Sequence, residues 1–135
     1  MKKTKVLIVE DEAMLADMYA TKFSMEGFEA EKANDGSEGL AKAATFKPDV
    51  ILLDIIMPKI DGFGVLKRLR AEAAFKHTLI VLLTNLGQED DVKKGKQLGA
   101  NDYFVKANHT PADVVEKIRK LTGVAPHQQQ QPHHQ

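Results

Sequence analysis

The sequence predicts a doubly wound α/β domain, in which helices cover both faces of a parallel sheet. Short aliphatic runs recur at 6–9, 50–53 and 79–83, and each is too continuously apolar for a strand with one face in water. Segments with apolar residues at three- and four-residue steps alternate with these runs, as expected for a chain of strand–helix units. Together the two patterns indicate an α/β fold.

Five strands are expected in chain order, at 6–9, 28–33, 50–53, 79–83 and 102–105. The second alternates apolar and charged residues, which is typical of a half-exposed strand at the edge of a sheet. Right-handed crossovers leave few topologies, and we choose the order 2-1-3-4-5, one of the common doubly wound orders, which makes a (βα)5 sandwich. All strands then end at one edge of the sheet, and ligands are expected at the switch point between strands one and three.

Five helices are expected between and after the strands. The first ends at Gly27, and its buried stripe is expected to comprise Leu15, Met18, Tyr19 and Phe23. The next three are expected at 37–44, around 65–69 and at 88–98. The helix at 88–98 is the weakest, because Gly95 inside it costs about 1 kcal/mol relative to alanine.

The last helix has the clearest limits. Thr110 is a suitable N-cap, Pro111 fits the first helical position, and Gly123 ends the helix. Its buried stripe is expected to comprise Val114, Ile118 and Leu121. We therefore place one domain at 1–123 and a disordered, Gln/His-rich tail at 124–135.

Composition narrows the class of protein. Lysine plus arginine equals aspartate plus glutamate at 19 each, so bulk charge gives no reason to expect binding to nucleic acid or to a membrane. The absence of cysteine excludes disulfides and thiolate chemistry and is compatible with a reducing cytosol. No apolar run approaches the roughly 20 residues of a membrane-spanning helix. We expect a soluble, cytoplasmic protein.

Polar side chains follow the predicted strands at the edge where the strands end. Glu10 and Asp11 follow the first strand, Asp54 the third, Thr84 the fourth and Lys106 the fifth. Neighbouring strands lie about 4.8 Å apart, so the three carboxylates must crowd together and repel one another unless a proton or a cation intervenes. A hard divalent ion suits an all-oxygen site, and Mg²⁺ fits best.

This residue set suits phosphoryl transfer. A carboxylate beside Mg²⁺ can attack phosphorus and form an acyl phosphate, and Asp54 is the better nucleophile because Glu10 and Asp11 can hold the metal together. Thr84 and Lys106 can donate to the phosphoryl oxygens. Taken alone, Glu10 and Asp11 could equally serve as a helix N-cap, and it is the whole set that favours a metal site.

The motifs VEDE, LLDIIMP, DG, LLT and DYFVK occur in this order between residue 4 and about 122. With them the chain resembles the receiver domains of two-component response regulators, of the stand-alone chemotaxis type with a flavodoxin-like fold. The resemblance implies that Asp54 is the phosphoacceptor, that a histidine kinase or histidine phosphotransfer protein is the donor, and that the domain assists only its own phosphorylation and dephosphorylation. It also implies a monomer or a phosphorylation-dependent dimer.

The resemblance further implies a role for each site residue. Mg²⁺ would be bound by Asp11, Asp54 and the backbone carbonyl of Ile56, with Glu10 acting through a metal-bound water. Thr84 and Lys106 would contact the phosphoryl group, and Tyr103 would turn inward when Thr84 moves. The resulting shift would change a surface made of helix four, strand five and helix five.

Three residues depart from the family pattern. Ala107 stands where proline is usual, so the Lys106–Ala107 bond, often cis in the family, is left open between cis and trans. Asn85 is bulkier than the usual small residue and would narrow phosphoryl access. Ile56 offers no hydrogen bond to an attacking water, so slow autodephosphorylation is expected.

Two other functions compete with the switch. A phosphorylation-independent interaction module could keep the same fold, but the complete set of acids, hydroxyl and lysine argues against it. A phosphatase acting on outside substrates would need residues beyond this set. The sequence leaves open whether the chain is a whole protein or part of a longer regulator.

Overall fold

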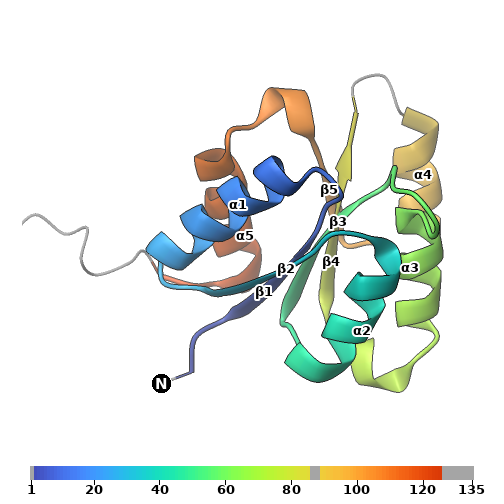
Figure 1. The fold of residues 1–135 in the computed structure, drawn as a ribbon, viewed down its shortest axis with the longest axis horizontal. Coiled ribbons are helices and arrows are strands. Elements are labelled where there is room, and N and C mark those ends of the chain that lie inside the picture. The colour runs from blue at the N-terminus through green and yellow to red at the C-terminus, as the bar shows by residue number, and fades with distance from the viewer. Residues whose placement is uncertain (1, 86–88, 126–135) are drawn as a thin grey trace, which may run out of the picture.

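A computed structural model describes residues 2–85 and 89–125 and confirms the predicted fold (Figure 1). Five parallel strands form one sheet in the order β2-β1-β3-β4-β5. Their limits are β1 Lys5–Val9, β2 Glu29–Ala33, β3 Val50–Asp54, β4 Leu79–Thr84 and β5 Asp102–Val105. Each limit agrees with the prediction to within one residue. Asp54 and Thr84 prove to be the last residues of their strands, which places them at the carboxyl edge of the sheet.

Five α-helices cover the sheet in the described residues. Their limits are α1 Ala13–Met25, α2 Gly36–Phe46, α3 Gly62–Arg70, α4 Glu89–Gln97 and α5 Pro111–Thr122. Two short 3-10 helices, η1 Ala73–Phe75 and η2 Lys106–Asn108, complete the chain order. Helices α1 and α5 lie on one face of the sheet, and α2, α3 and α4 lie on the other (Figure 1).

The core has two halves, because side chains alternate between the faces of each strand. On β1, Val6 and Ile8 pack with the helices α1 and α5, whereas Leu7 and Val9 pack with α2 and α3. The same alternation continues along β3 and β4. Both halves are fully shielded from water, which is why these strands read as unbroken apolar runs.

Several helix ends have the expected chemistry. Thr110 and Asp113 form a reciprocal capping box at the start of α5, with Pro111 in the first turn. Gly123 closes that helix in the left-handed conformation at φ 76°. Helix α2 begins one residue earlier than predicted, because the Asp35 side chain caps it by accepting a hydrogen bond from the Glu38 amide, and it ends two residues later, at Phe46.

The predicted buried stripes were wrong at two positions. Met18 is 48% exposed, because the buried face of α1 consists of Ala16, Tyr19 and Phe23. Leu121 is 40% exposed, because the last turn of α5 buries Arg119 instead. The Arg119 guanidinium reaches Glu26 at the end of α1, and a charge pair of this kind is compatible with burial.

Parts of two predictions lie outside the described residues. The predicted fourth helix includes residue 88, whereas α4 in the structure spans Glu89–Gln97, and most of the predicted tail lies beyond residue 125. Within the described ranges, none of the helices combines the length and the apolar character that crossing a bilayer requires.

Candidate functional site

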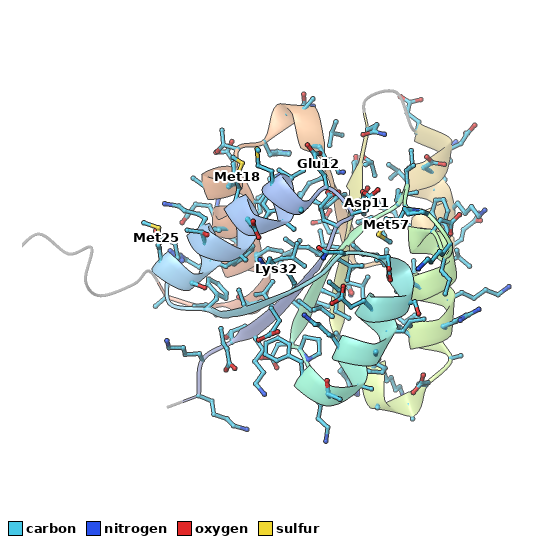
Figure 2. The ribbon with its side chains drawn as sticks, in the orientation of Figure 1. Asp11, Glu12, Met18, Met25, Lys32 and Met57 are labelled. Atoms are coloured by element: carbon cyan, nitrogen blue, oxygen red, sulfur yellow. The ribbon has the colours of Figure 1, made fainter. Side chains whose placement is uncertain are left out.

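The predicted acidic side chains converge at the carboxyl edge of the sheet. Strands β1 and β3 are direct neighbours, with Val9 opposite Leu53, so Glu10 and Asp54 leave the sheet side by side. Glu10, Asp11 and Asp54 each place a carboxylate oxygen within 4.8 Å of the others. In Figure 2, Asp11 and Glu12 lie at this edge, where β1 leads into α1.

Two of the three carboxylates are buried, and one lysine serves both. Glu10 and Asp54 are buried, whereas Asp11 is exposed. Lys106, the first residue after β5, places its Nζ 2.8 Å from Glu10 Oε1 and 3.1 Å from Asp54 Oδ2. The sequence predicted that Lys106 would lie at this edge, and the structure adds that the lysine joins two acids. A single ammonium thus faces two buried carboxylates.

This charge balance shifts two pKa values. Burial and the nearby Glu10 carboxylate raise the pKa of Asp54 from 3.8 to about 7, although Lys106 opposes the shift. Burial alone would lower the pKa of Lys106, but its contacts with Glu10 and Asp54 outweigh this and raise the lysine pKa. The site therefore holds Asp54 close to the balance between its neutral and charged forms at neutral pH.

The raised pKa predicts that the metal-free protein loses stability as pH increases. Folded Asp54 binds its proton more tightly than unfolded Asp54, so its contribution is complete below pH 4 and is lost as pH rises to about 7. We expect the unfolding free energy to fall by about 3 kcal/mol across this interval relative to Asp54→Asn, measured by urea denaturation at several pH values. Asp90→Asn, an exposed acid on α4, serves as the control. Parallel pH profiles for wild type and Asp54→Asn would contradict the prediction.

Thr84 and Tyr103 make their described contacts with β5 and α4. The buried Thr84 hydroxyl donates a hydrogen bond of 3.3 Å to the Phe104 carbonyl of β5. Tyr103 is partly buried, and Lys96 of α4 places its Nζ 5.5 Å from the centre of the tyrosine ring. The Thr84 hydroxyl is therefore engaged by β5, and the Tyr103 ring is in contact with α4.

The loops at this edge settle one open question and expose two side chains. The Lys106–Ala107 peptide bond, left open from the sequence, is trans. Ile56 is exposed in the loop after β3, and Asn85 is exposed directly after β4. Both residues closely follow strands that end at the edge of the sheet that carries the acids.

In the sequence, Gly62 stands out only as the glycine of the DG motif, in the loop after Asp54. In the structure, Gly62 begins α3 directly behind Asp54, and its amide donates a 2.8 Å hydrogen bond to the Ile55 carbonyl. The preceding Asp61 caps the helix by accepting from the Gly64 amide at 2.9 Å. The Asp-Gly pair was visible as a turn signal, but its closeness to Asp54 was not. The contact between Lys96 and Tyr103 had no signal in the sequence.

The residues present fit a magnesium ion. Their donor atoms are all carboxylate oxygens, which is the ligand class that this hard cation prefers. Glu10 Oε1 is buried, and the partner described for it is the Lys106 ammonium at 2.8 Å, which also serves Asp54. Two buried acids beside one lysine leave negative charge that a divalent cation would neutralise.

Comparisons with known proteins identify the class that this fold and site define. The model of the response regulator receiver domain matches residues 6–119, and the chain belongs to this family. The family functions in two-component signalling as a non-enzymatic phosphoacceptor.

Relatives from sequence and structure agree with this assignment. The chain is 42% identical over 119 residues to the "Probable transcriptional regulator ycf27" of Guillardia theta, covering 88% of this chain and 45% of that protein. It is 36% identical over 117 residues to the "DNA-binding dual master transcriptional regulator RpaA" of Synechocystis, covering 87% and 47%. The chemotaxis response regulator CheY4 of Vibrio cholerae superposes with a TM-score of 0.83 at 32% identity, covering 89% and 99%.

The two kinds of relative differ in length. The chain spans about half the length of the curated relatives it matches, and nearly all of the chemotaxis regulator. What the matched region shares with all of them is the receiver domain. The DNA-binding named for RpaA is a property of that longer protein.

Proposed function

We propose that this receiver domain works as a switch that accepts a phosphoryl group on Asp54. The observation that carries the proposal is the buried Asp54 carboxylate, which lies 3.1 Å from the Lys106 ammonium and shares its edge with Glu10 and Asp11. In the transfer, an Asp54 oxygen forms a bond to phosphorus as the P–N bond of a donor phosphohistidine breaks. The bonding electrons return to the imidazole nitrogen, and Asp54 becomes an acyl phosphate.

The other residues at the edge would support this transfer. Glu10, Asp11, Asp54 and the backbone carbonyl of Ile56 would hold Mg²⁺, with Glu10 acting through a water. When bound, the ion supplies positive charge beside the transferring phosphoryl oxygens. Lys106 is placed to pair with another phosphoryl oxygen once its ion pair with Asp54 opens.

Phosphorylation would then change the surface of the domain. To reach a phosphoryl oxygen, the Thr84 hydroxyl must give up its hydrogen bond to the Phe104 carbonyl, so the two arrangements exclude each other. We infer that Tyr103 moves inward as Thr84 moves toward Asp54. Because Tyr103 contacts Lys96, this movement alters the surface of α4, β5 and α5. The phosphoryl group favours one of two conformations that the domain already has.

The partners follow from the chemistry and the family. The donor would be a histidine kinase or a histidine phosphotransfer protein, and the target a downstream protein that recognises the surface of α4, β5 and α5. The domain itself would make no direct contact with nucleic acid or membrane. It would act in the cytoplasm, as a monomer or as a dimer formed on phosphorylation.

Acetyl phosphate with Mg²⁺ provides the direct test. Intact-mass spectrometry should show a gain of about 80 Da for wild type, no gain for Asp54→Asn and a strongly reduced gain for Asp11→Asn. The matched control is Asp90→Asn, which should be modified like wild type. A wild type that gains no mass, or an Asp54→Asn variant that gains as much, would overturn the proposal.

Ile56 is expected to make the phosphorylated form long-lived. Its apolar side chain is exposed in the loop after β3 and cannot orient an attacking water. Ile56→Asn should hydrolyse its acyl phosphate about 10-fold faster, which is less than the roughly 100-fold of a general base, because the amide orients the water without taking its proton. Phosphate release after removal of the donor measures the rate, and Leu121→Asn controls for adding an amide at an exposed apolar position. A wild-type half-life of seconds that no Ile56 substitution changes would contradict this.

A further inference from the structure

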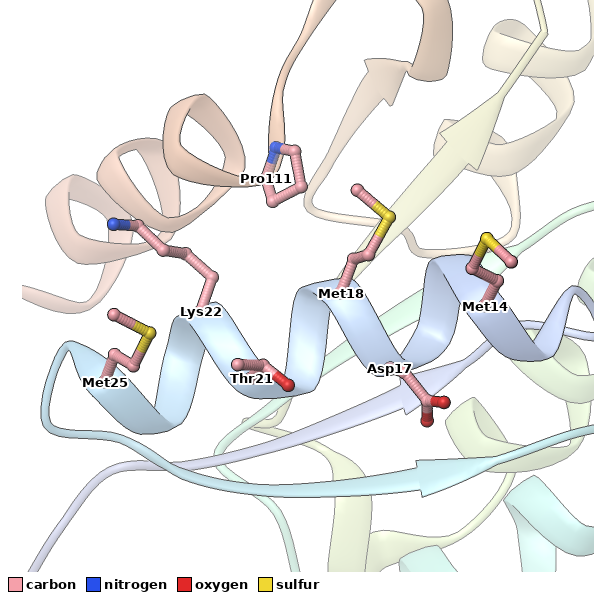
Figure 3. Close-up of a pocket in the computed structure, with 7 residues that line it drawn as sticks. All are labelled: Met14, Asp17, Met18, Thr21, Lys22, Met25 and Pro111. Atoms are coloured by element: carbon pink, nitrogen blue, oxygen red, sulfur yellow. The ribbon is translucent and has the colours of Figure 1, made fainter.

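Helix α1 carries a second apolar stripe on the side that does not face the core. Its members are Met14, Met18, Thr21 and Met25, and all four are exposed. Met14 is 74% exposed and Met25 62% exposed, so these are large apolar side chains in water rather than the edge of the core. Figure 3 shows the methionines along the outer surface of the helix. An apolar surface of this kind usually marks an interaction site.

The stripe borders a hollow in the protein surface. Met14, Met18, Met25 and Pro111, at the start of α5, line a groove of about 420 Å³ together with Asp17, Thr21 and Lys22. Figure 3 shows Pro111 facing α1 across from Met18 and Lys22. Unbranched methionine side chains adapt readily to the surface of a partner. A partner bound in this groove would therefore contact the methionine side chains of α1 and the ring of Pro111.

The spacing of the stripe indicates that the occupant is a helix. Its members follow at steps of four, three and four residues, which is the spacing of successive core positions in a coiled coil. In that register Met18 and Met25 take the a positions, and Met14 and Thr21 take the d positions. A facing helix with the same spacing could insert its side chains between them.

Charges beside the stripe indicate that the facing helix is a second copy of α1. Asp17 directly precedes Met18 and takes a g position, and Lys22 directly follows Thr21 and takes an e position. In a parallel pair, a g residue faces the e residue five positions along the other helix. Asp17 therefore faces Lys22 of the second copy, and symmetry repeats the contact. An antiparallel pair offers no such match, because Asp17 then lies near Ser24 of the second copy.

We propose that two copies of this chain associate through parallel α1 helices, with the Met14, Met18, Thr21 and Met25 stripe as the seam and two Asp17–Lys22 pairs beside it. Asp17 and Lys22 point to different sides of α1, as this arrangement requires (Figure 3). Within one chain, Asp17 pairs with Lys32 and Lys22 with Glu26. Asp17 and Lys32 are both exposed, so their pair can exchange at little cost. Glu26 is only 10% exposed, but it keeps its ion pair with the buried Arg119 when Lys22 turns to the second copy.

The proposed dimer has two consequences. One short helix per copy buries little surface, so the association is weak and concentration-dependent. It also needs no phosphoryl group, so it is a different association from the dimer formed on phosphorylation and does not depend on the switch proposed above. Since the two helices run parallel, both acidic sites would face the same direction, each at the start of its own α1.

A charge-swap experiment on the full chain tests the seam. Sedimentation velocity should show wild type shifting from monomer to dimer as its concentration rises toward about 1 mM. D17K and K22D should each weaken self-association at least 10-fold, because each places like charges at both flanking contacts. An equimolar mixture of D17K and K22D should recover dimerisation, because both contacts between unlike copies are then complementary.

Controls separate the seam from general charge effects. D90K and K67D reverse exposed charges on α4 and α3 and should dimerise like wild type, and modification by acetyl phosphate shows that each variant is folded. A wild type that stays monomeric, single variants that dimerise normally, or a mixture that stays monomeric would each overturn the proposal. If wild type stays monomeric while M18K blocks phosphotransfer from a kinase, a helix of that kinase occupies the groove instead.

Discussion

Replacing Lys106 with methionine is expected to slow the phosphorylation of Asp54 by acetyl phosphate about 100-fold, the usual cost of removing one electrostatic donor from a transition state. Methionine keeps much of the length of the lysine side chain and removes the charge that lies 2.8 Å from Glu10 and 3.1 Å from Asp54. The developing charge on the phosphoryl oxygens then loses a cation, and the two buried carboxylates lose their shared counter-ion. Both changes reduce the reactivity of Asp54.

The lost counter-ion has a second, separable effect. With Glu10 and Asp54 facing each other unscreened, Lys106→Met should raise the pKa of Asp54 further, because Lys106 is what opposes its rise in wild type. Both proteins should react faster at pH 9 than at pH 7. The ratio of the two rates should be larger for Lys106→Met than for wild type. If Lys106 acted only by stabilising the transition state, its loss would lower the rate by the same factor at both pH values.

The measurement is the initial rate of mass gain at fixed Mg²⁺ and acetyl phosphate. Lys106→Arg keeps the charge in a different shape and should fall between wild type and Lys106→Met. Lys120→Met removes an exposed lysine from α5 and should react like wild type. If Lys106→Met gains mass as fast as wild type, Lys106 has no part in the transfer.

The sequence predicted correctly those features that can be read from a single strand and from the order of the strands. The strand ends at Glu10, Asp54 and Thr84 could be read from apolar runs that stop at polar residues, because parallel strands must end at one edge. The sequence order of the motifs then brought the acids and Lys106 to that edge. These inferences need only the period of a strand and the topology of the sheet.

The sequence failed where the position of a side chain depends on two elements at once. Arg119 is buried in place of Leu121 because Glu26, 93 residues away, supplies its partner. The Thr84 hydroxyl is engaged by the Phe104 carbonyl, which no local pattern indicates. The exposed Met18 shows a further limit, because two apolar stripes on one helix cannot be told apart without knowing which of them faces the sheet.

The position of Gly62 also depends on two elements at once, β3 and α3, and it leads to the largest expected effect on stability. A Cβ atom at residue 62 would lie 2.4 Å from the Asp54 carbonyl oxygen and 2.7 Å from Ile55 Cα. Both contacts are with backbone atoms, so no side chain can rotate to relieve them. Gly62→Ala must therefore shift the start of α3 or the end of β3, and we expect it to lower the unfolding free energy by about 3 kcal/mol.

The same displacement should reach the phosphorylation site, because the crowded oxygen belongs to Asp54 itself. Urea denaturation measures the stability loss, and the rate of mass gain with acetyl phosphate in the folded fraction measures the loss of function. Gly64→Ala is the matched control in the same helix. Its Cβ would lie 2.8 Å from the Cγ2 methyl of Ile60, a side-chain contact that rotation about χ1 can relieve, and alanine favours a helix. Equal stability for Gly62→Ala and Gly64→Ala would show that the tight approach of α3 to Asp54 is not what fixes this edge of the sheet.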